Sequence, residues 1–223
     1  WGSQVKNHAL TYGNKAENLI VTGSPRHDNF FRSIDKGKSK GIILFATTGV
    51  TGRISYGQTH LDAYTKFESF VREVCRIAKN FPDKQLVVKP HPQPDYISNI
   101  TKIIKEIDPT IPILYNANLI ELINSCDVLI TFNNSTVVLE SMILGRPAIS
   151  LQIEKWAEED EIVKSNALLS ISKIEEIENG IKKILYDKEY QNRLVENSKI
   201  FVNDYFANHG VASHEVTKLL DSF

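Results

Sequence analysis

Ser135, Thr136 and Glu140 form the first group of side chains in this sequence that could do chemistry. They follow the apolar run 128–132, which predicts a buried strand, and they open a segment with helical spacing. Hydroxyl and amide groups at a helix start favour a bound anion, because the positive end of the helix dipole lies there. Glu140, one turn further on, could point back toward a sugar hydroxyl of the same ligand. In the alternative interpretation, Asn134 or Ser135 only caps the helix and Glu140 is a solvated charge.

His91 is the second candidate, and it stands between Pro90 and Pro92. It follows the predicted strand 85–89, whose last residue is Lys89, and the two prolines restrict the backbone around it. Ligands of open parallel sheets bind at the carboxyl ends of the strands. This position therefore predicts a ligand contact for His91, although the ring could instead bridge loop carbonyl groups.

Two further segments contain residues that occur in binding sites. Thr48 and Gly49 open a loop, 48–53, whose glycines allow the backbone to approach a ligand closely, a permissive but unspecific signal. The acidic run 158–161 lacks the spacing that would bring its carboxylates to one ion. We expect a solvated face there and no metal site.

The elements that must position these residues alternate between strands and helices. Apolar runs predict strands at 18–22, 41–47, 85–89, 112–115, 128–132, 148–150 and 167–171, and helical spacing predicts helices at 61–80, 96–107, 119–125, 137–144, 173–185, 189–205 and 211–220. From residue 41 onward the spacing requires crossover connections. The sequence therefore predicts an α/β fold, a doubly wound, Rossmann-like parallel sheet of about six strands.

Length, charge and cysteine content narrow the classes of protein. A formal net charge of −1 over 223 residues gives no support for nucleic-acid binding. Cys75 and Cys126 lie in apolar patterns and are predicted to be reduced core thiols. No apolar run has the length of a membrane span, and no signal peptide opens the chain, which favours a cytoplasmic location. The only methionine is Met142, so we expect a fragment or a processed chain.

Three motifs in this order carry a family resemblance. They are VTGSPRHD at 21–28, Lys89-Pro90-His91-Pro92, and Ser135-Thr136 with Glu140. Together they resemble the carboxyl-terminal domain of glycosyltransferase-B-fold enzymes, and most closely the group that includes CDP-glycerol glycerophosphotransferases and capsule polysaccharide transferases. The likeness covers nearly the whole chain.

This resemblance implies a division of the chain and a function. Residues 1–40 would connect to a missing amino-terminal domain, and residues 41–223 would bind the activated donor, with the last helix able to pack back on the missing domain. The enzyme would move a sugar or glycerophosphate from a CDP-, CMP- or UDP-linked donor to a glycan or lipid-linked acceptor held by the missing domain. It would need no separate cofactor, and it would work in the cytoplasm or at the inner face of the membrane. The fragment alone would be inactive.

The resemblance also implies roles for individual residues. His91 would meet the donor phosphates and supply positive charge to the leaving group, so it is the catalytic candidate. Glu140 would accept hydrogen bonds from the ribose. The remaining donor-binding candidates, which include Asn118 as a positional hypothesis, are Lys89, Thr48, Gly49, Asn118, Asn134, Ser135 and Thr136.

Two other functions stay open at this point. UDP-N-acetylglucosamine 2-epimerases share the architecture, and His91-Pro92-Gln93-Pro94 is similar to their histidine-proline segment. Where they have paired glycines and paired glutamates, however, this chain has Asn133-Asn134 and Leu139-Glu140, and Thr48-Gly49-Val50 replaces a basic segment. We therefore rank the transferase first and the epimerase second. The third possibility is a nucleotide-binding module without catalysis.

Overall fold

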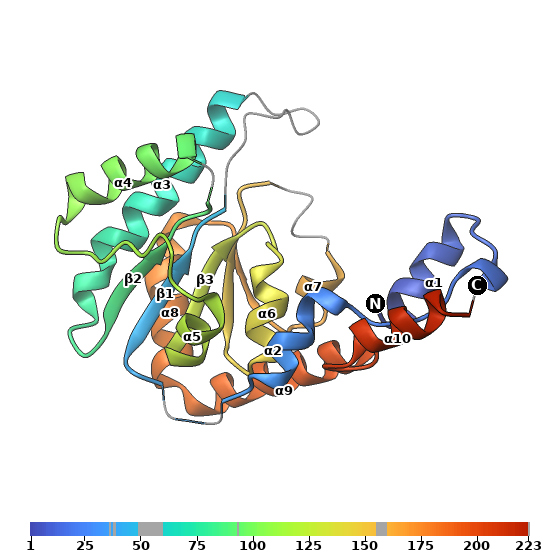
Figure 1. The fold of residues 1–223 in the computed structure, drawn as a ribbon. Coiled ribbons are helices and arrows are strands. Elements are labelled where there is room, and N and C mark those ends of the chain that lie inside the picture. Colours follow the sequence, from blue (N-terminus) through green and yellow to red (C-terminus); the bar gives the residue numbers. More distant parts are fainter. Residues whose placement is uncertain (36, 38, 49–59, 93, 155–159, 223) are drawn as a thin grey trace.

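A five-stranded parallel sheet forms the centre of the protein (Figure 1). The structure, a computed structural model, describes residues 1–35, 37, 39–48, 60–92, 94–154 and 160–222. The strands lie in the order β2-β1-β3-β4-β5, and every neighbouring pair is parallel. Their bounds are β1 (Ile42–Ala46), β2 (Gln85–Lys89), β3 (Cys126–Phe132), β4 (Ala148–Leu151) and β5 (Leu169–Ile171).

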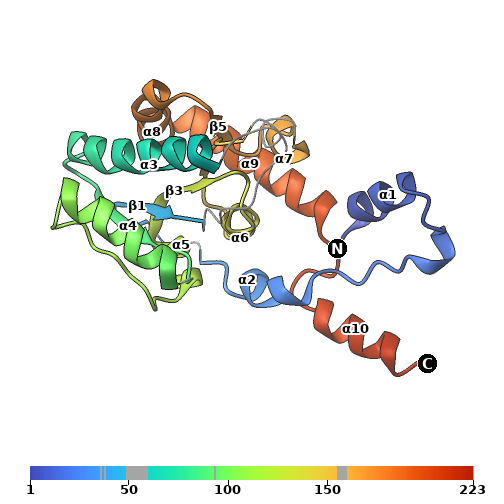
Figure 2. The same cartoon turned by 90° about the horizontal axis from the view of Figure 1, so that it is seen from above.

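Helices connect the strands and cover both faces of the sheet (Figures 1 and 2). The crossover helices are α3 (His60–Ile77), α4 (Pro94–Ile107), α5 (Leu119–Ser125), α6 (Val137–Ile143) and α7 (Glu161–Lys164). After β5 the chain continues as α8 (Ile177–Tyr186), α9 (Lys188–Tyr205) and α10 (Ala212–Leu220). The doubly wound α/β fold is thus confirmed.

Alternating strand side chains build two separate cores. In β1, Ile43 and Phe45 point into a cluster with buried residues of α3, α4 and α8. Leu44 and Ala46 point the other way, into a cluster with α5, α6 and the second half of α9. This alternation follows from the period of two in a strand, and all five residues of β1 are apolar because both faces of the sheet are covered. Cys75 lies in the first cluster and Cys126 in the second, as the sequence predicted for core thiols.

Two of the seven predicted strands do not form, and the loss of 112–115 reduces the expected six-stranded sheet to five strands. Residues 112–115 make only an isolated parallel bridge between Ile113 and Val88, at the β2 edge of the sheet. Including this bridge, the sequence of strands would match the 3-2-1-4-5-6 order of dinucleotide-binding folds. The segment 18–22 belongs to no strand, because it lies beyond the sheet and has no strand to pair with.

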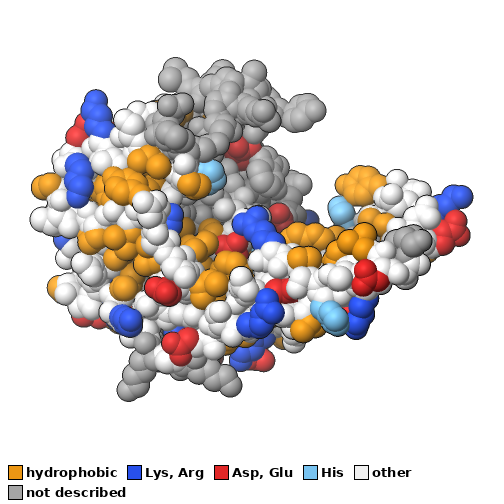
Figure 3. Space-filling model, viewed as in Figure 1, with side chains coloured by type: hydrophobic (Ala, Val, Ile, Leu, Met, Phe, Trp, Pro, Cys, Tyr) orange, Lys and Arg blue, Asp and Glu red, His pale blue; other side chains and the backbone are white. Residues whose placement is uncertain are grey.

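The amino-terminal segment and α10 project from the sheet beyond the carboxyl end of α9 (Figures 1 and 2). The segment contains α1 (Ser3–Thr11), which packs on α9, and α2 (Asp28–Arg32), with single turns at Ala16–Asn18 and Pro25–His27. Hydrophobic side chains lie on the surface of this part (Figure 3). Tyr12 and Ile20 of the amino-terminal segment are among the exposed ones. The predicted boundary at residue 40 stays a prediction.

Buried polar contacts hold this projecting part together. The carboxylate of Asp28 accepts hydrogen bonds from the backbone amides of Ala212, at 2.9 Å, and Ser213, at 2.8 Å. Asp28 therefore caps the start of α10 from a position 184 residues earlier in the chain. The amino-terminal segment and the last helix are joined through this contact.

Candidate functional site

The carboxyl ends of β1, β2, β3 and β4 lie along one edge of the sheet, because all four strands are parallel. The chain leaves β1 toward β2 on one side and later returns to β3 on the other side. Such a change of direction opens a crevice at the strand ends, where open α/β sheets bind their ligands. The loops that carry His91, Asn134 and Thr136 all start from this edge.

Asn133 and Asn134 shape the turn between β3 and α6. Both have positive φ angles, 46° and 52°, in the left-handed region where glycine is favoured and asparagine is tolerated. The side-chain oxygen of Asn133 accepts hydrogen bonds from the amides of Ile153, at 2.8 Å, and Glu154, at 3.2 Å. The side-chain oxygen of Asn134 accepts one from Gln152 Nε2 at 3.0 Å. The turn is therefore fastened to the end of β4.

This arrangement changes the role expected for the polar residues before α6. They were predicted to cap the helix, yet the N-cap residue is Thr136 and its side chain makes no capping bond. Asn133 and Asn134 bind the β4 loop instead, and the half-buried Ser135 donates its amide to Phe132 O at 3.0 Å. Of the predicted phosphate-binding residues, Thr136 is the exposed one.

Glu140 is buried and paired with a cation from a distant segment. It is 2% exposed, and its Oε1 lies 3.0 Å from Arg26 Nη2, which also donates to Thr136 Oγ1 at 3.3 Å. Burial raises the pKa of the Glu140 carboxyl above its ordinary value, while the charge and hydrogen bond of Arg26 oppose the rise. The prediction of a solvated charge at Glu140 is wrong.

Arg26 is the site residue that the sequence reasoning missed. It lies in the VTGSPRHD segment, which supported the family resemblance but received no chemical role. Its pairing with Glu140 spans 114 residues, so no local pattern could reveal it. The signal in the sequence that could have indicated a role for Arg26 was its position as a charged residue in a polar turn between two apolar segments.

A rigid cluster presents Arg26 to the site. The neighbouring His27 is 0% exposed, and its ring contacts Trp1, Phe30 and Phe206 at centroid distances of 4.9–6.0 Å. His27 Nδ1 lies 2.7 Å from Ser24 Oγ. Burial, followed by the charge of Arg26, lowers the pKa of His27 from 6.5 to about 4. The ring is therefore neutral at pH 7.

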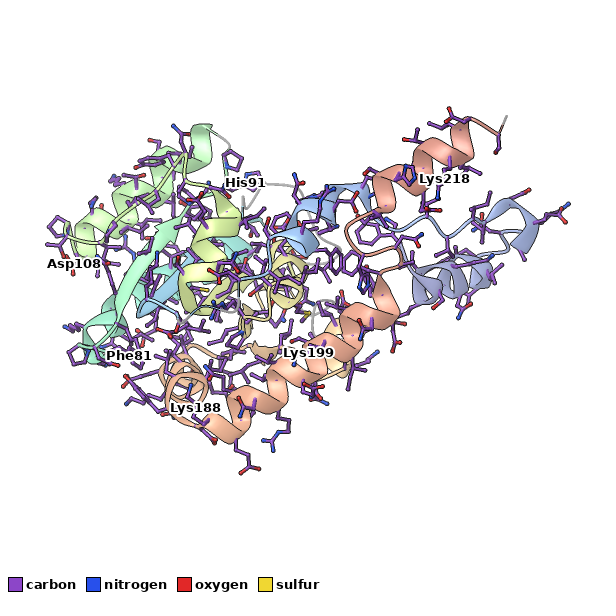
Figure 4. All side chains as sticks on the ribbon, turned by 60° about the horizontal axis from the view of Figure 1, so that its bottom comes forward. Phe81, His91, Asp108, Lys188, Lys199 and Lys218 are labelled. Carbon is purple, nitrogen blue, oxygen red and sulfur yellow. The ribbon has the colours of Figure 1, made fainter. Side chains whose placement is uncertain are left out.

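His91 and Lys89 occupy different environments at the end of β2. His91 is half-buried close to the start of α4 (Figure 4), and within the described residues its buried Nδ1 has no hydrogen-bond partner. A buried ring nitrogen without a protein partner, at the carboxyl ends of the strands, could form a hydrogen bond to a ligand. Lys89 Nζ donates to Tyr115 O at 2.9 Å, and burial lowers its pKa. Lys89 thus ties β2 to the Ile113 segment.

The remaining predicted contacts are divided between structural roles and undescribed positions. Asn118 caps α5, since its side-chain oxygen accepts from the amide of Ile120 at 3.0 Å. Thr48 is half-buried after β1, and Gly49 lies outside the described residues. In the acidic run only Asp160 and Glu161 are described, and Asp160 caps α7. The structure brings together Arg26, Thr136 and Glu140, and it leaves Lys89 and Asn118 in supporting positions.

A cavity of about 590 Å³ opens beside the start of α6. Asn134, Thr136 and Leu139 line it on one side, and residues of α1, α7 and α9 line it on the other. Its size lies within the range of small-molecule sites, about 300–1,000 Å³. No three His, Cys, Asp or Glu side chains gather into a metal site in the part of the chain that the structure describes. Likewise, no described helix is long and apolar enough to cross a membrane.

Solved structures with the same fold include sugar-nucleotide enzymes. The UDP-GlcNAc 2-epimerase of Neisseria meningitidis, bound to UDP-GlcNAc, superposes with a TM-score of 0.72 at 17% identity, over 100% of this chain and 60% of its own length. The Staphylococcus aureus MnaA–UDP structure gives 0.70 at 17%, over 97% and 57%. The carboxyl-terminal domain of a group 1 glycosyl transferase, LpcC from Francisella tularensis, gives 0.52 at 14%, over 84% and 98%.

These likenesses show the fold, and the chain spans 60% and 57% of the lengths of the first two of these proteins. No curated protein matches the sequence. The narrower resemblance to the CDP-glycerol transferase group stays a prediction. A model of the UDP-N-acetylglucosamine 2-epimerase family, in contrast, matches residues 3–217. Because this match covers nearly all of the 223 residues, the chain belongs to the UDP-N-acetylglucosamine 2-epimerase family.

Proposed function

We propose that the chain binds a UDP-linked sugar at the carboxyl edge of its sheet, as the nucleotide-binding part of a sugar-nucleotide enzyme of the cytoplasm. The observation that carries the proposal is the buried carboxylate of Glu140 beside the exposed Thr136 at this edge, in a chain of this family. Deeply buried carboxyl groups are uncommon because their desolvation is unfavourable, and functional sites are one of the places where they occur. The proposed ligand needs protein groups that accept hydrogen bonds from its ribose hydroxyls and protein groups that donate hydrogen bonds to its phosphates. This site offers both.

Each contact follows from the chemistry of the ligand. His91 would donate a hydrogen bond from its ring to a phosphate. This bond would either involve Nδ1, which has no partner among the described residues, or fix the orientation of the ring. Ser135 and Thr136 would donate hydroxyl groups to the same phosphates. Glu140 would accept from a ribose hydroxyl through Oε2, because Oε1 already accepts from Arg26. No metal or cofactor is part of this proposal.

The reaction favoured for the whole protein is inversion at C2 of the sugar. Family membership supports it, and the positive φ angles of Asn133 and Asn134 remove one sequence argument against it. Asparagine at these positions adopts the backbone that the paired glycines of the epimerases would adopt easily. The replacement of the paired glycines by Asn133 and Asn134 therefore leaves the backbone conformation of this turn accessible.

Transfer of a sugar or glycerophosphate to a glycan or lipid-linked acceptor is the second candidate. Leu139 favours it, since it stands where the epimerases have one of two paired glutamates, and it is buried in an apolar cluster. An apolar side chain there cannot supply the second carboxylate. A CDP- or CMP-linked donor remains compatible with this second reaction.

Ligand-dependent melting tests the binding proposal directly. We expect UDP and UDP-GlcNAc to raise the melting temperature of this chain, in the presence of EDTA, more than CDP or CDP-glycerol. A ligand at 100 times its Kd stabilises the native state by about 2.7 kcal/mol, which corresponds to about 5–10 °C for a chain of this size. Absence of any shift with millimolar nucleotides would contradict the proposal. A larger shift with CDP ligands would favour the transferase.

Activity requires a longer protein that also carries the other half of the cleft. The longer protein should invert C2 of UDP-GlcNAc in an NMR assay, and this chain alone should not, because catalytic groups must be held in line with the bound sugar. A parallel assay with radiolabelled CDP-glycerol or UDP-sugar and lipid-linked acceptors tests transfer. Equal turnover by the isolated chain would show that these residues suffice for the reaction.

A further inference from the structure

We propose that Arg26 binds the phosphates of the nucleotide sugar, and that Glu140 and Thr136 hold its guanidinium in position for this contact. The inference rests on the proposed function, and it adds a ligand-binding residue that the sequence motifs did not indicate. It is argued from the hydrogen bonds of Arg26, from the rigidity of its backbone and from the imbalance of its ion pair.

The guanidinium of Arg26 has donors left over. Nη2 serves Glu140 Oε1 at 3.0 Å and Thr136 Oγ1 at 3.3 Å, whereas Nε and Nη1 bind nothing within the described residues. The side chain is 64% exposed, so these N–H groups face solvent. The remaining N–H groups on Nε and Nη1 point in fixed directions in the guanidinium plane, so each can donate a charge-assisted hydrogen bond to a phosphate oxygen, whereas an ammonium acts as a point charge.

The backbone around Arg26 is fixed before any ligand arrives. Arg26 lies in the single turn Pro25–His27, with Ser24 and His27 buried and joined to each other. The next residue, Asp28, accepts two amide hydrogen bonds at the start of α10. A side chain held at both its base and its tip loses little entropy on binding, and such preorganisation strengthens a contact.

The ion pair itself has little value as a structural contact. Glu140 is almost fully buried, whereas Arg26 is mostly in water, so solvent weakens their attraction while the carboxylate still loses its hydration. A well-packed apolar residue on α6 would stabilise the fold at least as well. The pair makes physical sense if the carboxylate positions the arginine beside a ligand. Thr136, which accepts a hydrogen bond from Arg26, is also one of the residues that line the 590 Å³ cavity.

Nucleotide and nucleoside binding by matched variants test this proposal. UDP and uridine are titrated into wild type, Arg26→Ala, Arg26→Lys and Arg32→Ala, and binding is followed by NMR chemical shifts, which also report on folding. Arg32 is the control, since it lies on the same connector and binds only Asn29 Oδ1, at 3.1 Å, among the described residues. We expect Arg26→Ala to weaken UDP binding about 10- to 100-fold, the effect of losing charge-assisted hydrogen bonds. Uridine binding should not change.

The outcomes separate this inference from the proposed function. If wild type binds neither ligand, the proposed function fails. If wild type binds UDP and Arg26→Ala binds it equally well, or if Arg26→Ala weakens UDP and uridine alike, the phosphate contact is wrong and the proposed function stands. If Arg26→Ala does not fold, Arg26→Lys decides, because lysine keeps the positive charge but lacks the planar set of N–H donors. Unchanged UDP affinity in Arg26→Lys would overturn the role of the guanidinium.

The supporting role of Glu140 is tested by a double-mutant cycle. Glu140→Gln, Arg26→Ala and the double variant are compared for the loss of affinity toward 2′,3′-dideoxy-UDP, which has no ribose hydroxyls to bind Glu140. If Glu140 acts through Arg26, the double variant should bind this ligand no more weakly than Arg26→Ala alone. Additive losses would show that Glu140 does not act by positioning the arginine.

Discussion

Acidification should destabilise the protein through His27. This ring is buried in an aromatic cluster, and its pKa is lowered from 6.5 to about 4, first by burial and then by the charge of Arg26. The unfolded chain binds a proton near pH 6.5, whereas the folded chain does so only near pH 4. The contribution of the neutral ring is therefore fully present above pH 6.5 and is lost as the pH falls toward 4.

The size of this effect follows from the pKa difference. Each tenfold change in proton affinity is worth about 1.4 kcal/mol, so the loss between pH 6.5 and pH 4 amounts to roughly 3 kcal/mol. The free energy of unfolding of an ordinary domain is about 5–15 kcal/mol. One histidine would thus remove a large share of the stability.

Urea unfolding at pH 7.5, 6.5, 5.5 and 4.5 measures this contribution, with His27→Phe as the variant that keeps an aromatic ring and loses the titration. As the pH falls over this range, wild type should lose about 2–3 kcal/mol more of its unfolding free energy than His27→Phe does. His214→Asn, at an exposed position of α10, is the control and should follow wild type. Parallel pH profiles for wild type and His27→Phe would refute the reasoning.

Three further predictions concern the site and its frame. His91→Ala should weaken UDP binding by about 1.5–3 kcal/mol, the range for a hydrogen bond to a charged group, without changing the melting temperature; unchanged calorimetric affinity would contradict the contact. Glu140→Gln should reduce affinity for UDP more than for 2′,3′-dideoxy-UDP, because only UDP offers ribose hydroxyls, and equal losses would exclude the ribose contact. Asp28→Ala should lower stability by about 2–3 kcal/mol and expose the amides of Ala212 and Ser213 to hydrogen exchange, with Asp35→Ala as an exposed control; intact protection would show that Asp28 is not the cap.

Elements with a strong local pattern were predictable from the sequence. The apolar run of β3, the helical spacing of α6 and the stop at Gly145, which has a φ angle of 68°, all appear in the structure as expected. The segment 112–115 has a similar apolar composition, yet it forms a single bridge to β2. Composition gives a strand its tendency to form, and pairing with a neighbour far away in the chain decides its length.

For the candidate site, the sequence predicted the location and the residues Thr136 and Glu140, but not the partners of these side chains. Parallel strands bring His91 and Thr136 to one edge of the sheet, and the spacing of the elements already implied this edge. Which side chain uses which partner depended on contacts between distant segments: Arg26 with Glu140, and Asn134 with Gln152. A sequence pattern reports periods of two to four residues, so it cannot detect such pairs.

The alkylation of the two native cysteines can be used to measure unfolding of the protein. Burial raises the pKa of both the Cys75 and Cys126 thiols to about 12, so at pH 7 only on the order of 1 in 100,000 of each is the reactive thiolate. An alkylating reagent should therefore modify them only when the structure opens. Since each core beside the sheet contains one of the two thiols, mass spectrometry of the alkylated peptides would show whether the layer of α3, α4 and α8 opens before the layer of α5 and α6. A surface cysteine could also be introduced for labelling without first removing either native one.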